Sequence, residues 1–550
     1  MKIWEKRDTS VTTIEEAHNK KLGISSKDAL SKWVKKGKDD KYFLPGTEAF
    51  TELLYRYKNR PVYIMGDYDV DGICATCILK LTLKWLGFAN VKHRIPKRFS
   101  EGYGMNRAMV DEIKEDDALI ITVDNGIAAM DVVSYAKSKG HAVIVTDHHE
   151  PVKTEDSVVI PRADLVIDPK AFPGLTRFDG YCGAGIAYKL ARHLLKGIKG
   201  RHLALLPLAA LATACDQMPI REENYYLLKM GLQIMNQYGQ TDLVPKGLRA
   251  LGEVAGITHW TEDKFTFNVG PMLNSKERMS DGGADDAIEL LECGDLYQCR
   301  LMAEKVKETN EQRKKMVSAA VEGLSGGIEK NDDGSVVFPL IRYLSACSEG
   351  IIGIIAGQLL DKYGVPAGVF TDAKETDLYK GSFRSTDDFD IMSLLNKHRD
   401  MFEACGGHAA AAGASVKKEK FDSMVKAMQK SASSVKLSEK KNLYDVEIDN
   451  ADIRQAIEEN GAYAPFGQGN EDLIFKIVNF CPEKRFGEWK KTLKGNGFKL
   501  SSKYSDAIGF NLTDVPEITS SSPVTIYGHI SMNVFNGKET PQIMILDIAA

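Results

Sequence analysis

Short apolar runs alternate with amphipathic stretches through much of the first half of the chain. The apolar runs are rich in β-forming residues, and the stretches between them repeat apolar residues at helical spacing. The predicted strands cover residues 62–65, 91–95, 118–123 and 142–146, and the predicted helices between them cover 73–86 and 128–139. Strands that alternate with helices in this way predict βαβ units around a parallel sheet.

The pattern changes several times and divides the chain into five segments. Gly326 and the run from Asn331 to Ser335 mark one of these changes, because such residues favour turns. The segments are an N-terminal helical segment (1–58), a parallel-sheet domain (59–225), a largely helical connector (226–335), a second α/β domain (336–435) and a β-rich tail that suggests a small barrel (442–550). The predicted fold class is therefore α/β with a β-barrel tail.

Composition narrows the class of protein. Of the 550 residues, 43% are hydrophobic and 27% are charged, which is typical of soluble globular proteins and excludes a largely disordered chain. The longest uncharged apolar run, Leu203 to Cys215, is too short to cross a bilayer, and the first ten residues do not resemble a secretory signal. We expect no membrane partner and a cytoplasmic location, since nine dispersed cysteines do not resemble a disulfide framework.

One cysteine pair, Cys74 and Cys77, has the spacing of a metal or redox motif. No second pair lies nearby, and the surrounding stretch is an apolar helix in our prediction. We therefore favour packing in the core over a zinc or redox site. The net charge of −4 also gives no global basic signal, so a nucleic-acid partner would have to bind to local patches.

Three of the predicted strands are followed directly by acidic residues or histidines. The first strand precedes Asp67, Asp69 and Asp71, the third precedes Asp124, and the fourth precedes Asp147, His148 and His149. Because the carboxyl ends of parallel strands open on one edge of a sheet, these side chains should meet in one crevice. So many carboxylates repel one another unless divalent cations neutralise them. A mixed Asp and His set suits Mn²⁺, whereas oxygen ligands alone suit Mg²⁺ or Ca²⁺ better.

Solvated turns are the main alternative to this metal site. A single D-x-D-x-D-G run is weak evidence, because Asp-Gly turns are common and EF-hand loops look similar. The EF-hand interpretation fails here because no Glu stands at the twelfth position. Three acidic strand ends together with a His pair are much harder to obtain by chance.

The runs GDYDVDG (66–72), VDNG (123–126) and TDHH (146–149) resemble the first three motifs of the DHH phosphoesterase superfamily. A fourth motif, an acidic residue that ends an apolar helix, is matched by ALATACDQMPI with Asp216. Within the superfamily the match is closest to the RecJ branch of single-strand-specific 5′→3′ exonucleases. Further collinear segments that fit this branch are 95–98, 101–104, 182–187, 270–274, 381–385, 406–413 and 465–470. The resemblance implies a DHH domain, a DHHA1-like domain and a C-terminal OB-fold barrel.

The resemblance also implies roles for individual residues. The ligands of two metal ions, Mn²⁺ or Mg²⁺, would be Asp69, Asp71, Asp124, His148 and Asp216, with Asp124 bridging. We further assign catalytic roles to Asp67, which supports the first motif, to His149, which would face the scissile phosphate, and to Arg278. Two ions in such a site can activate water without a covalent protein nucleophile.

Other residues outside the metal set are predicted to bind the substrate. Arg98, Ser382 and Arg384 match positions that resemble a pocket for a 5′-terminal phosphate, and Asn274 belongs to the Gly-Pro segment of the family. An Arg side chain suits such a pocket because it can hold two phosphate oxygens. Gly406, Gly407 and His408 are predicted to form a glycine turn in which the backbone approaches a phosphate; a plain loop is the alternative.

Three residues depart from the family's pattern. Met272 stands where an Arg is usual, Glu277 replaces a Gly, and Ser348 occupies a position that is often His. These departures concern the contacts to the scissile phosphate and the rate, and they leave the set of metal ligands whole.

The tail contains a basic stretch. Residues 484–503 carry seven basic residues against one acidic residue, interleaved with Phe486, Trp489 and Phe498. OB folds hold single strands with this combination of charge and stacking. The alternative is a solvated lysine face over a core that contains the aromatic residues.

The leading hypothesis is a metal-dependent 5′→3′ exonuclease on single-stranded DNA, aided by a helicase or a single-strand-binding protein. A second enzyme hypothesis keeps the same site but takes short oligonucleotides or cyclic dinucleotides; the OB tail argues against it. A third is a non-catalytic RecJ-like replication scaffold, and the retained metal ligands argue against that one.

Overall fold

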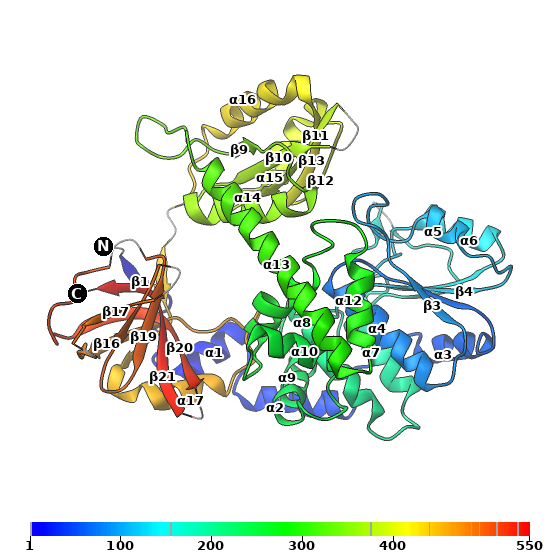
Figure 1. Cartoon of the computed structure of the whole chain (residues 1–550), viewed down its shortest axis with the longest axis horizontal. Helices are drawn as coiled ribbons and strands as arrows, with labels where there is room; N and C mark the ends of the chain where they lie inside the picture. Colours follow the sequence, from blue (N-terminus) through cyan, green and yellow to red (C-terminus); the bar gives the residue numbers. More distant parts are fainter. Residues whose placement is uncertain are drawn as a thin grey trace.

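The computed structural model describes residues 3–154, 157–373, 377–438, 441–485, 487–493, 496–512, 515–535 and 538–549. Three α/β or β-rich bodies surround a helical connector, and one long helix runs between the connector and the uppermost body (Figure 1). This architecture confirms the predicted fold class. Among the described residues, no helix is long and apolar enough to cross a membrane.

The first domain has a five-stranded parallel sheet. Its strands run in the order β3 (Val91–Arg94), β2 (Val62–Met65), β4 (Leu119–Val123), β5 (Ala142–Thr146) and β8 (Leu165–Ile167). Its helices are α4 (Val70–Trp85), α5 (Arg107–Asp111), α6 (Met130–Ser138), α7 (Gly183–Leu194) and α8 (Leu206–Cys215). Two short strands, β6 (Val152–Lys153) and β7 (Val158–Val159), pair with each other in antiparallel orientation. The strands lie within a residue or so of the predicted ones, so the apolar runs predicted this sheet correctly.

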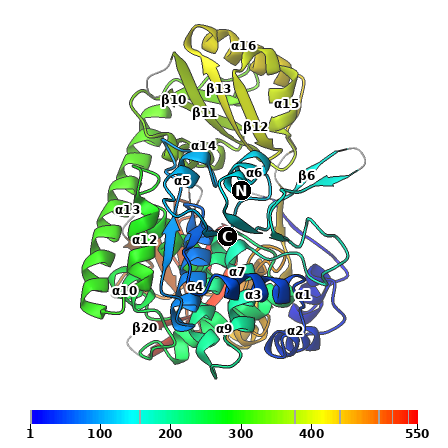
Figure 2. The same ribbon diagram turned by 90° about the vertical axis from the view of Figure 1, so that its right-hand side faces the viewer.

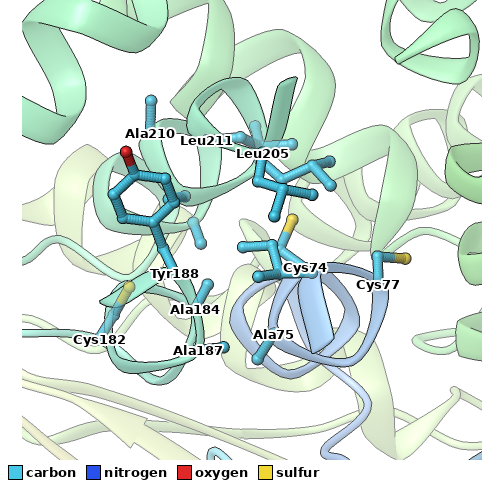
Figure 3. Packing of buried hydrophobic residues seen from close by; sticks show 14 of the residues in the cluster. Cys74, Ala75, Cys77, Cys182, Ala184, Ala187, Tyr188, Leu205, Ala210 and Leu211 are labelled. Atoms are coloured by element: carbon cyan, nitrogen blue, oxygen red, sulfur yellow. The ribbon is translucent and has the colours of Figure 1, made fainter. Parts of the chain in front are cut away.

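Helix α4 is the centre of the largest hydrophobic core. It follows the first acidic motif, begins after the N-cap Asp69, and packs against α7 and α8. Cys74 and Cys77 are both fully buried in this core. Cys74 lies beside residues of α7 and α8, whereas Cys77 points away from them (Figure 3), and its Sγ lies 3.9 Å from the carbonyl oxygen of Ile288. The core-packing interpretation of the C-x-x-C pair is therefore the one that the structure supports.

The connector is helical, as predicted. It contains α9 (Glu222–Gln237), α10 (Lys246–Ala255), a π-helix (Lys264–Val269), α11 (Gly270–Leu273), α12 (Gly283–Glu292) and α13 (Leu296–Leu324). Helix α13 has 29 residues and packs on α10 at one end and on α14 of the second domain at the other (Figure 2). It thereby sets the distance between the two α/β domains.

The second α/β domain has a mixed five-stranded sheet. The order is β12 (Ala404–His408), β13 (Ala411–Lys417), β11 (Leu378–Arg384), β10 (Ala367–Asp372) and β9 (Leu340–Tyr343), with α14 (Glu349–Tyr363), α15 (Ile391–Lys397) and α16 (Phe421–Ala432). The predicted glycine turn at 406–408 is wrong, because these residues form part of edge strand β12 and pair with β13. Gly407 still requires glycine: its φ is 140°, and a Cβ there would lie 2.4 Å from the Ala411 carbonyl oxygen.

The tail is a seven-stranded sheet with its own core. Its strands are β15 (Val446–Asp449), β16 (Phe475–Phe480), β20 (Val524–Phe535), β21 (Lys538–Ala549), β19 (Asp506–Phe510), β18 (Gly497–Ser501) and β17 (Lys490–Leu493), in sheet order. Helix α17 (Ile453–Gly461) packs on β20. Short 3₁₀ turns of the chain lie at Arg201–Leu205, Arg399–Met401, Lys418–Lys420 and Asn450–Asp452.

The N-terminal segment is not purely helical. Its first residues form β1 (Trp4–Lys6), which pairs in parallel with β14 (Asn442–Tyr444). Helix α1 (Ile14–Leu22) contributes Ile14 and Ala17 to the hydrophobic core of the tail, whereas α2 (Asp28–Lys38) and α3 (Thr47–Arg56) pack against helices α9 and α7. The helical prediction for residues 1–58 missed β1, because three residues carry too little pattern to reveal a strand whose partner lies more than 400 residues away.

Candidate active site

The carboxyl ends of β2, β4 and β5 place the predicted acidic residues and histidines at one edge of the parallel sheet. Three groups of three residues, which share some members, each have ligand atoms within 4.8 Å of one another. The groups are Asp67, Asp69 and Asp124; Asp71, His148 and Asp216; and Asp124, His148 and His149. The crevice predicted from the strand ends is therefore present, and Asp216 at the end of α8 joins it as the resemblance implied.

His148 lies at the centre of this cluster. Its Nε2 atom is 3.1 Å from an oxygen of Asp124 and 3.7 Å from oxygens of both Asp71 and Asp216. Burial lowers the pKa of His148, which favours the neutral imidazole that binds metals. Oxygens of three carboxylates thus lie within 3.7 Å of one imidazole nitrogen.

The amino end of α7 holds Asp71 in place. The backbone N–H groups of Gly183 and Ala184 donate to its two carboxylate oxygens at 2.6 and 2.8 Å. A helix N-terminus favours negative charge because its N–H groups are otherwise unpaired. Gly183 must be glycine for this approach, because a Cβ there would lie 2.5 Å from the Cβ of Asp124.

Asp69 and Asp124 are fixed by their own backbone positions. Asp69 is the N-cap of α4 and accepts from the N–H groups of Asp71 and Gly72. Asp124 has a φ of 62°, the left-handed region that Asp tolerates better than most residues. The neighbouring Asn125 stabilises this turn: its side chain donates to the carbonyls of Met65 and Val123 and accepts from the N–H of Met105.

The cluster has the electrostatics of a cation site. Burial, together with the negative charge of Asp69, raises the pKa of Asp67 to about 8, and burial together with Asp71 raises the pKa of Asp216 to about 8. The pKa values of Asp69 and Asp124 are raised for the same two reasons, burial and the charge of Asp71. Within the described residues, one buried oxygen of Asp67 and one of Asp124 accept no hydrogen bond. Buried carboxylates that lack donors and repel one another fit divalent cations.

Asp147 orients His149, a role that the sequence analysis did not assign. One oxygen of Asp147 accepts from Nδ1 of His149 at 2.7 Å and from the backbone N–H of His148 at 2.8 Å. Although burial lowers the pKa of His149, the hydrogen bond and charge of Asp147 raise it overall. The Tyr103 hydroxyl lies 3.3 Å from the same ring and donates to the Asp124 carbonyl. The segment containing Tyr103 fitted the family, but no local pattern indicated a role for this residue.

Arg98 and Arg278 lie close to the acidic cluster, and Arg313 and Arg384 lie close to Arg278. The Arg98 guanidinium lies 5.1 Å from the ring centre of Tyr68, within the first acidic motif. Burial, followed by the positive charges of Arg98 and Arg313, lowers the pKa of Arg278 to about 10, with a smaller contribution from Arg384. Arg313 on α13 is a residue that the sequence analysis missed; it is buried and donates to Asn310 at 2.8 Å. Three of these four arginines were predicted site residues.

The other predicted substrate residues lie on or near the second domain. Arg384 donates to Ser382 at 3.1 Å, and both side chains approach α14 at Gly353. Ser382 and Gly406 line one groove together with Glu349 and Lys380. Exposed Gly407 and His408 continue along β12 beyond Gly406, whereas Asn274 follows α11 in the connector.

The three departures from the family's pattern have structural roles. Met272 is buried in the main core. Ser348 is the N-cap of α14 and donates to the Arg278 carbonyl at 2.8 Å. Glu277 accepts from the backbone N–H groups of Gly283 at 2.7 Å and of Arg98 at 3.1 Å. Two of the three therefore hold the segment that carries Arg278.

The basic stretch of the tail only partly matches its prediction. Phe498 is buried in the core of the tail, so for this residue the alternative interpretation is correct. Phe486 lies outside the described residues. Trp489 and Tyr504 line a groove with six basic and four acidic side chains, and three of the basic ones form ion pairs with acidic neighbours. The basic lining consists of Arg454, Arg485, Lys491, Lys499, Lys503 and Lys538.

Comparison with known families gives three matches in the same order as the three bodies of the fold. Residues 61–214 match the DHH family, N-terminal domain; residues 338–434 match the DHHA1 domain; and residues 444–547 match the RecJ OB domain. The predicted DHH, DHHA1 and OB domains are thereby confirmed.

Individual proteins with similar sequences extend this result. The chain is 32% identical over 500 residues to the single-stranded-DNA-specific exonuclease RecJ of Bacillus subtilis, which covers 89% of this chain and 61% of the relative. It is 30% identical over 402 residues to the enzyme of the same name from Salmonella typhimurium, covering 69% of this chain and 68% of the relative. This chain therefore spans less than two thirds of the Bacillus protein's length.

Solved structures give the same fold. The crystal structure of RecJ from Thermus thermophilus in complex with Mn²⁺ matches with a TM-score of 0.78 and 23% identity, covering 98% of this chain and 76% of that one. The three domains match in the same order, and the Salmonella typhimurium relative is 30% identical with 68% of its length covered. The chain therefore belongs to the RecJ family.

Proposed function

We propose that this chain hydrolyses single-stranded DNA from its 5′ end in a reaction that depends on two divalent cations, Mn²⁺ or Mg²⁺. The observation that supports it most is the arrangement of Asp71, Asp124 and Asp216 within 3.1–3.7 Å of one imidazole nitrogen of His148. The relatives named above are single-stranded-DNA-specific exonucleases, and the Thermus thermophilus structure is described as a complex with Mn²⁺.

Each part of the site has a task in this proposal. Asp69, Asp71, Asp124, His148 and Asp216 would hold the cations, which supply positive charge and help to activate a water for attack on phosphorus. His149, held by Asp147, would contact the scissile phosphate from the solvent side, since its side chain is 46% exposed. Asp67 would support the cation site, and Arg278 would balance charge on the phosphate.

A cation titration with three kinds of labelled substrate tests the proposal. We expect Mn²⁺-dependent release of nucleotides from single strands, little release from blunt duplexes, and little hydrolysis of dinucleotides. Preference for dinucleotides would favour the oligonucleotide hypothesis, and binding without hydrolysis would favour the scaffold. A helicase or a single-strand-binding protein as a partner stays a prediction.

The direction of digestion follows from the phosphate pocket that we propose around Arg98, Ser382 and Arg384. An Arg side chain can hold a terminal phosphate by charge-assisted hydrogen bonds worth about 1.5–3 kcal/mol each. Arg384→Ala should therefore reduce kcat/KM at least about tenfold on 5′-phosphorylated strands and much less on 5′-hydroxyl strands. Paired oligonucleotides that differ only in the 5′ group provide the measurement.

Arg399→Ala is the matched control, because Arg399 lies in the same domain and donates to its own chain at Phe402. The control should keep the wild-type preference for a 5′-phosphate. Digestion that begins at 3′ ends, or a preference that Arg384→Ala leaves unchanged, would contradict the pocket.

We propose that the groove lined by Trp489 and Tyr504 holds the strand away from the chemistry. Each phosphate contact that is lost should reduce the slope of log affinity against log salt by about 0.7 for single strands. Lys491→Ala with Lys503→Ala should therefore lower the slope by about 1.4, and Trp489→Ala should weaken binding by about 1–3 kcal/mol. Anisotropy titrations at several salt concentrations measure both effects.

Exposed lysines of α13, such as Lys305 and Lys314, provide the charge-matched control. A salt slope that falls equally in both double variants would argue against the groove. Point substitutions are preferable to removing residues 442–550, because that deletion would also remove β14, the partner of β1, and the carbonyl of Gln468 that accepts from Ile220.

A further inference from the structure

Two acidic residues of the connector bind the loop that carries Arg98. Glu277 and Asp281 lie in the turns between α11 and α12, and the loop at residues 98–100 belongs to the first domain. Their carboxylates accept from two successive backbone N–H groups of this loop: Glu277 from Arg98 at 3.1 Å, and Asp281 from Phe99 at 2.9 Å. Asp281 also accepts from the Ser100 hydroxyl at 2.9 Å.

Glu277 uses both of its oxygens. It is 2% exposed, and while one oxygen accepts from Arg98, the other accepts from the N–H groups of Gly283 at 2.7 Å and Ala284 at 3.2 Å. A Cβ at position 283 would lie 2.3 Å from the Glu277 nitrogen, so the turn closes tightly on this carboxylate. One side chain therefore fixes the start of α12 and the position of the Arg98 backbone together.

The Arg98 side chain points toward the first acidic motif. Its guanidinium lies over the ring of Tyr68, which stands between Asp67 and Asp69 in the first acidic motif. Arg278 follows Glu277 directly in the sequence, and the positive charge of Arg98 helps to lower its pKa. A shift of the 98–100 loop would therefore move Arg98, a residue of the proposed pocket, relative to Arg278 and to the acidic cluster.

We infer that Glu277 and Asp281 form a carboxylate clamp that positions Arg98 for the 5′-terminal phosphate of the strand, which makes Glu277 a positioning residue for end recognition. The inference rests on the proposed function, since it names residues that set the substrate preference of the same site. A carboxylate suits this task because a charged acceptor makes shorter and stronger bonds to backbone N–H groups than a neutral one. Such rigid support matters because a misplacement of about 1 Å can cost a factor of about 100 in rate.

A simpler role for Glu277 would be to cap α12 alone. The two roles differ in what a substitution changes. Loss of a cap alone would lower thermal stability without altering the ratio of activities on 5′-phosphorylated and 5′-hydroxyl strands. Loss of the clamp would change that ratio and would loosen the 98–100 loop.

The experiment compares Glu277→Ala, Glu277→Gln and Arg98→Ala in the full chain. We expect Glu277→Ala to lower the preference for 5′-phosphorylated strands about 10- to 100-fold, mainly through KM, and to add little to Arg98→Ala in the double variant. Glu277→Gln should fall between, because an amide keeps one accepting oxygen but cannot serve both sets of N–H groups. It also keeps the test available if the Ala variant folds poorly.

Hydrogen exchange provides a readout that does not depend on activity. Peptides covering residues 97–103 should exchange faster in Glu277→Ala and Asp281→Ala than in the wild type. Glu262→Ala is the matched control, because Glu262 also accepts a backbone N–H across the connector, from Phe466 at 2.8 Å, but lies against the tail. It should leave both the exchange of 97–103 and the 5′-phosphate preference unchanged.

The possible results separate the clamp from the proposed function. An inactive wild type would overturn the exonuclease proposal, and faster exchange at 97–103 would still establish the clamp in that case. Faster exchange with an unchanged 5′-phosphate preference would overturn Glu277 as a positioning residue. Unchanged exchange in both variants would overturn the clamp itself.

Discussion

Replacing Asp124 by Asn should reduce cleavage of single strands by more than about 100-fold while leaving the fold intact. Even residues that only support metal ligands typically cost about 10- to 100-fold when substituted. Asp124 should cost more, because it lies within 4.8 Å of the ligand atoms in two of the three groups, one with Asp67 and Asp69 and one with the two histidines. Its loss should change the affinity or spacing of both cations.

The same substitution should make the cation-free protein more stable. Asp124 is buried, and its pKa is raised by burial and by the charge of Asp71, so its carboxylate opposes folding when no cation is present. The neutral amide of the Asp124→Asn variant would remove this repulsion at nearly constant shape. We expect an increase in the melting temperature without added cation, and a smaller further increase when Mn²⁺ is added, because ligand binding to the folded state stabilises it.

Thermal unfolding with and without Mn²⁺ provides the measurement. Asp164→Asn is a suitable control, because Asp164 also accepts a backbone N–H, from Val143 at 2.8 Å, but lies at the opposite ends of the strands. Cleavage near the wild-type rate in the Asp124→Asn variant would remove Asp124 from the mechanism. An unchanged stabilisation by Mn²⁺ would show that the cations bind elsewhere.

The parallel sheet and its acidic edge were predictable because both depend on local patterns. The runs at 62–65 and 142–146 are apolar except for Thr146 at the end of the second, as strands covered on both faces require, and both became strands with these bounds. The direction of parallel strands then brings Asp67, Asp124 and His148 to one edge without further information. Asp216 has no such pattern and was predicted only through the family's motif.

The remaining features depend on contacts between distant segments. Trp4 pairs with Asn442, and Arg98 is held by Glu277, so neither partner is visible in its local sequence. Phe498 was predicted to stack on bases because basic residues surround it in the sequence. Successive side chains of β18 point to opposite faces of the sheet, and Phe498 lies on the face that packs into the core. The turn predicted at Gly406 failed for a related reason: glycines in an edge strand give the same local pattern as glycines in a loop.

His149→Ala should reduce kcat by about 10²- to 10⁴-fold, the usual range for a side chain that assists proton transfer or charge balance at a reacting group. Its affinity for Mn²⁺ should change little, because His148 is the central imidazole of the cluster. Cleavage rates at saturating strand and Mn²⁺ concentrations measure this effect. A variant with the wild-type rate would contradict the role of His149.

Asp147 allows a sharper test, because it acts on both histidines through different bonds. It accepts from the His149 ring at 2.7 Å and from the His148 backbone at 2.8 Å. Asp147→Asn should therefore lower both kcat and the apparent affinity for Mn²⁺. At saturating Mn²⁺ it should have no further effect in the His149→Ala background, since its remaining contribution to kcat passes through that ring. Additive losses in the double variant would instead place Asp147 in direct contact with the reaction, and the orientation of His149 would then have another cause.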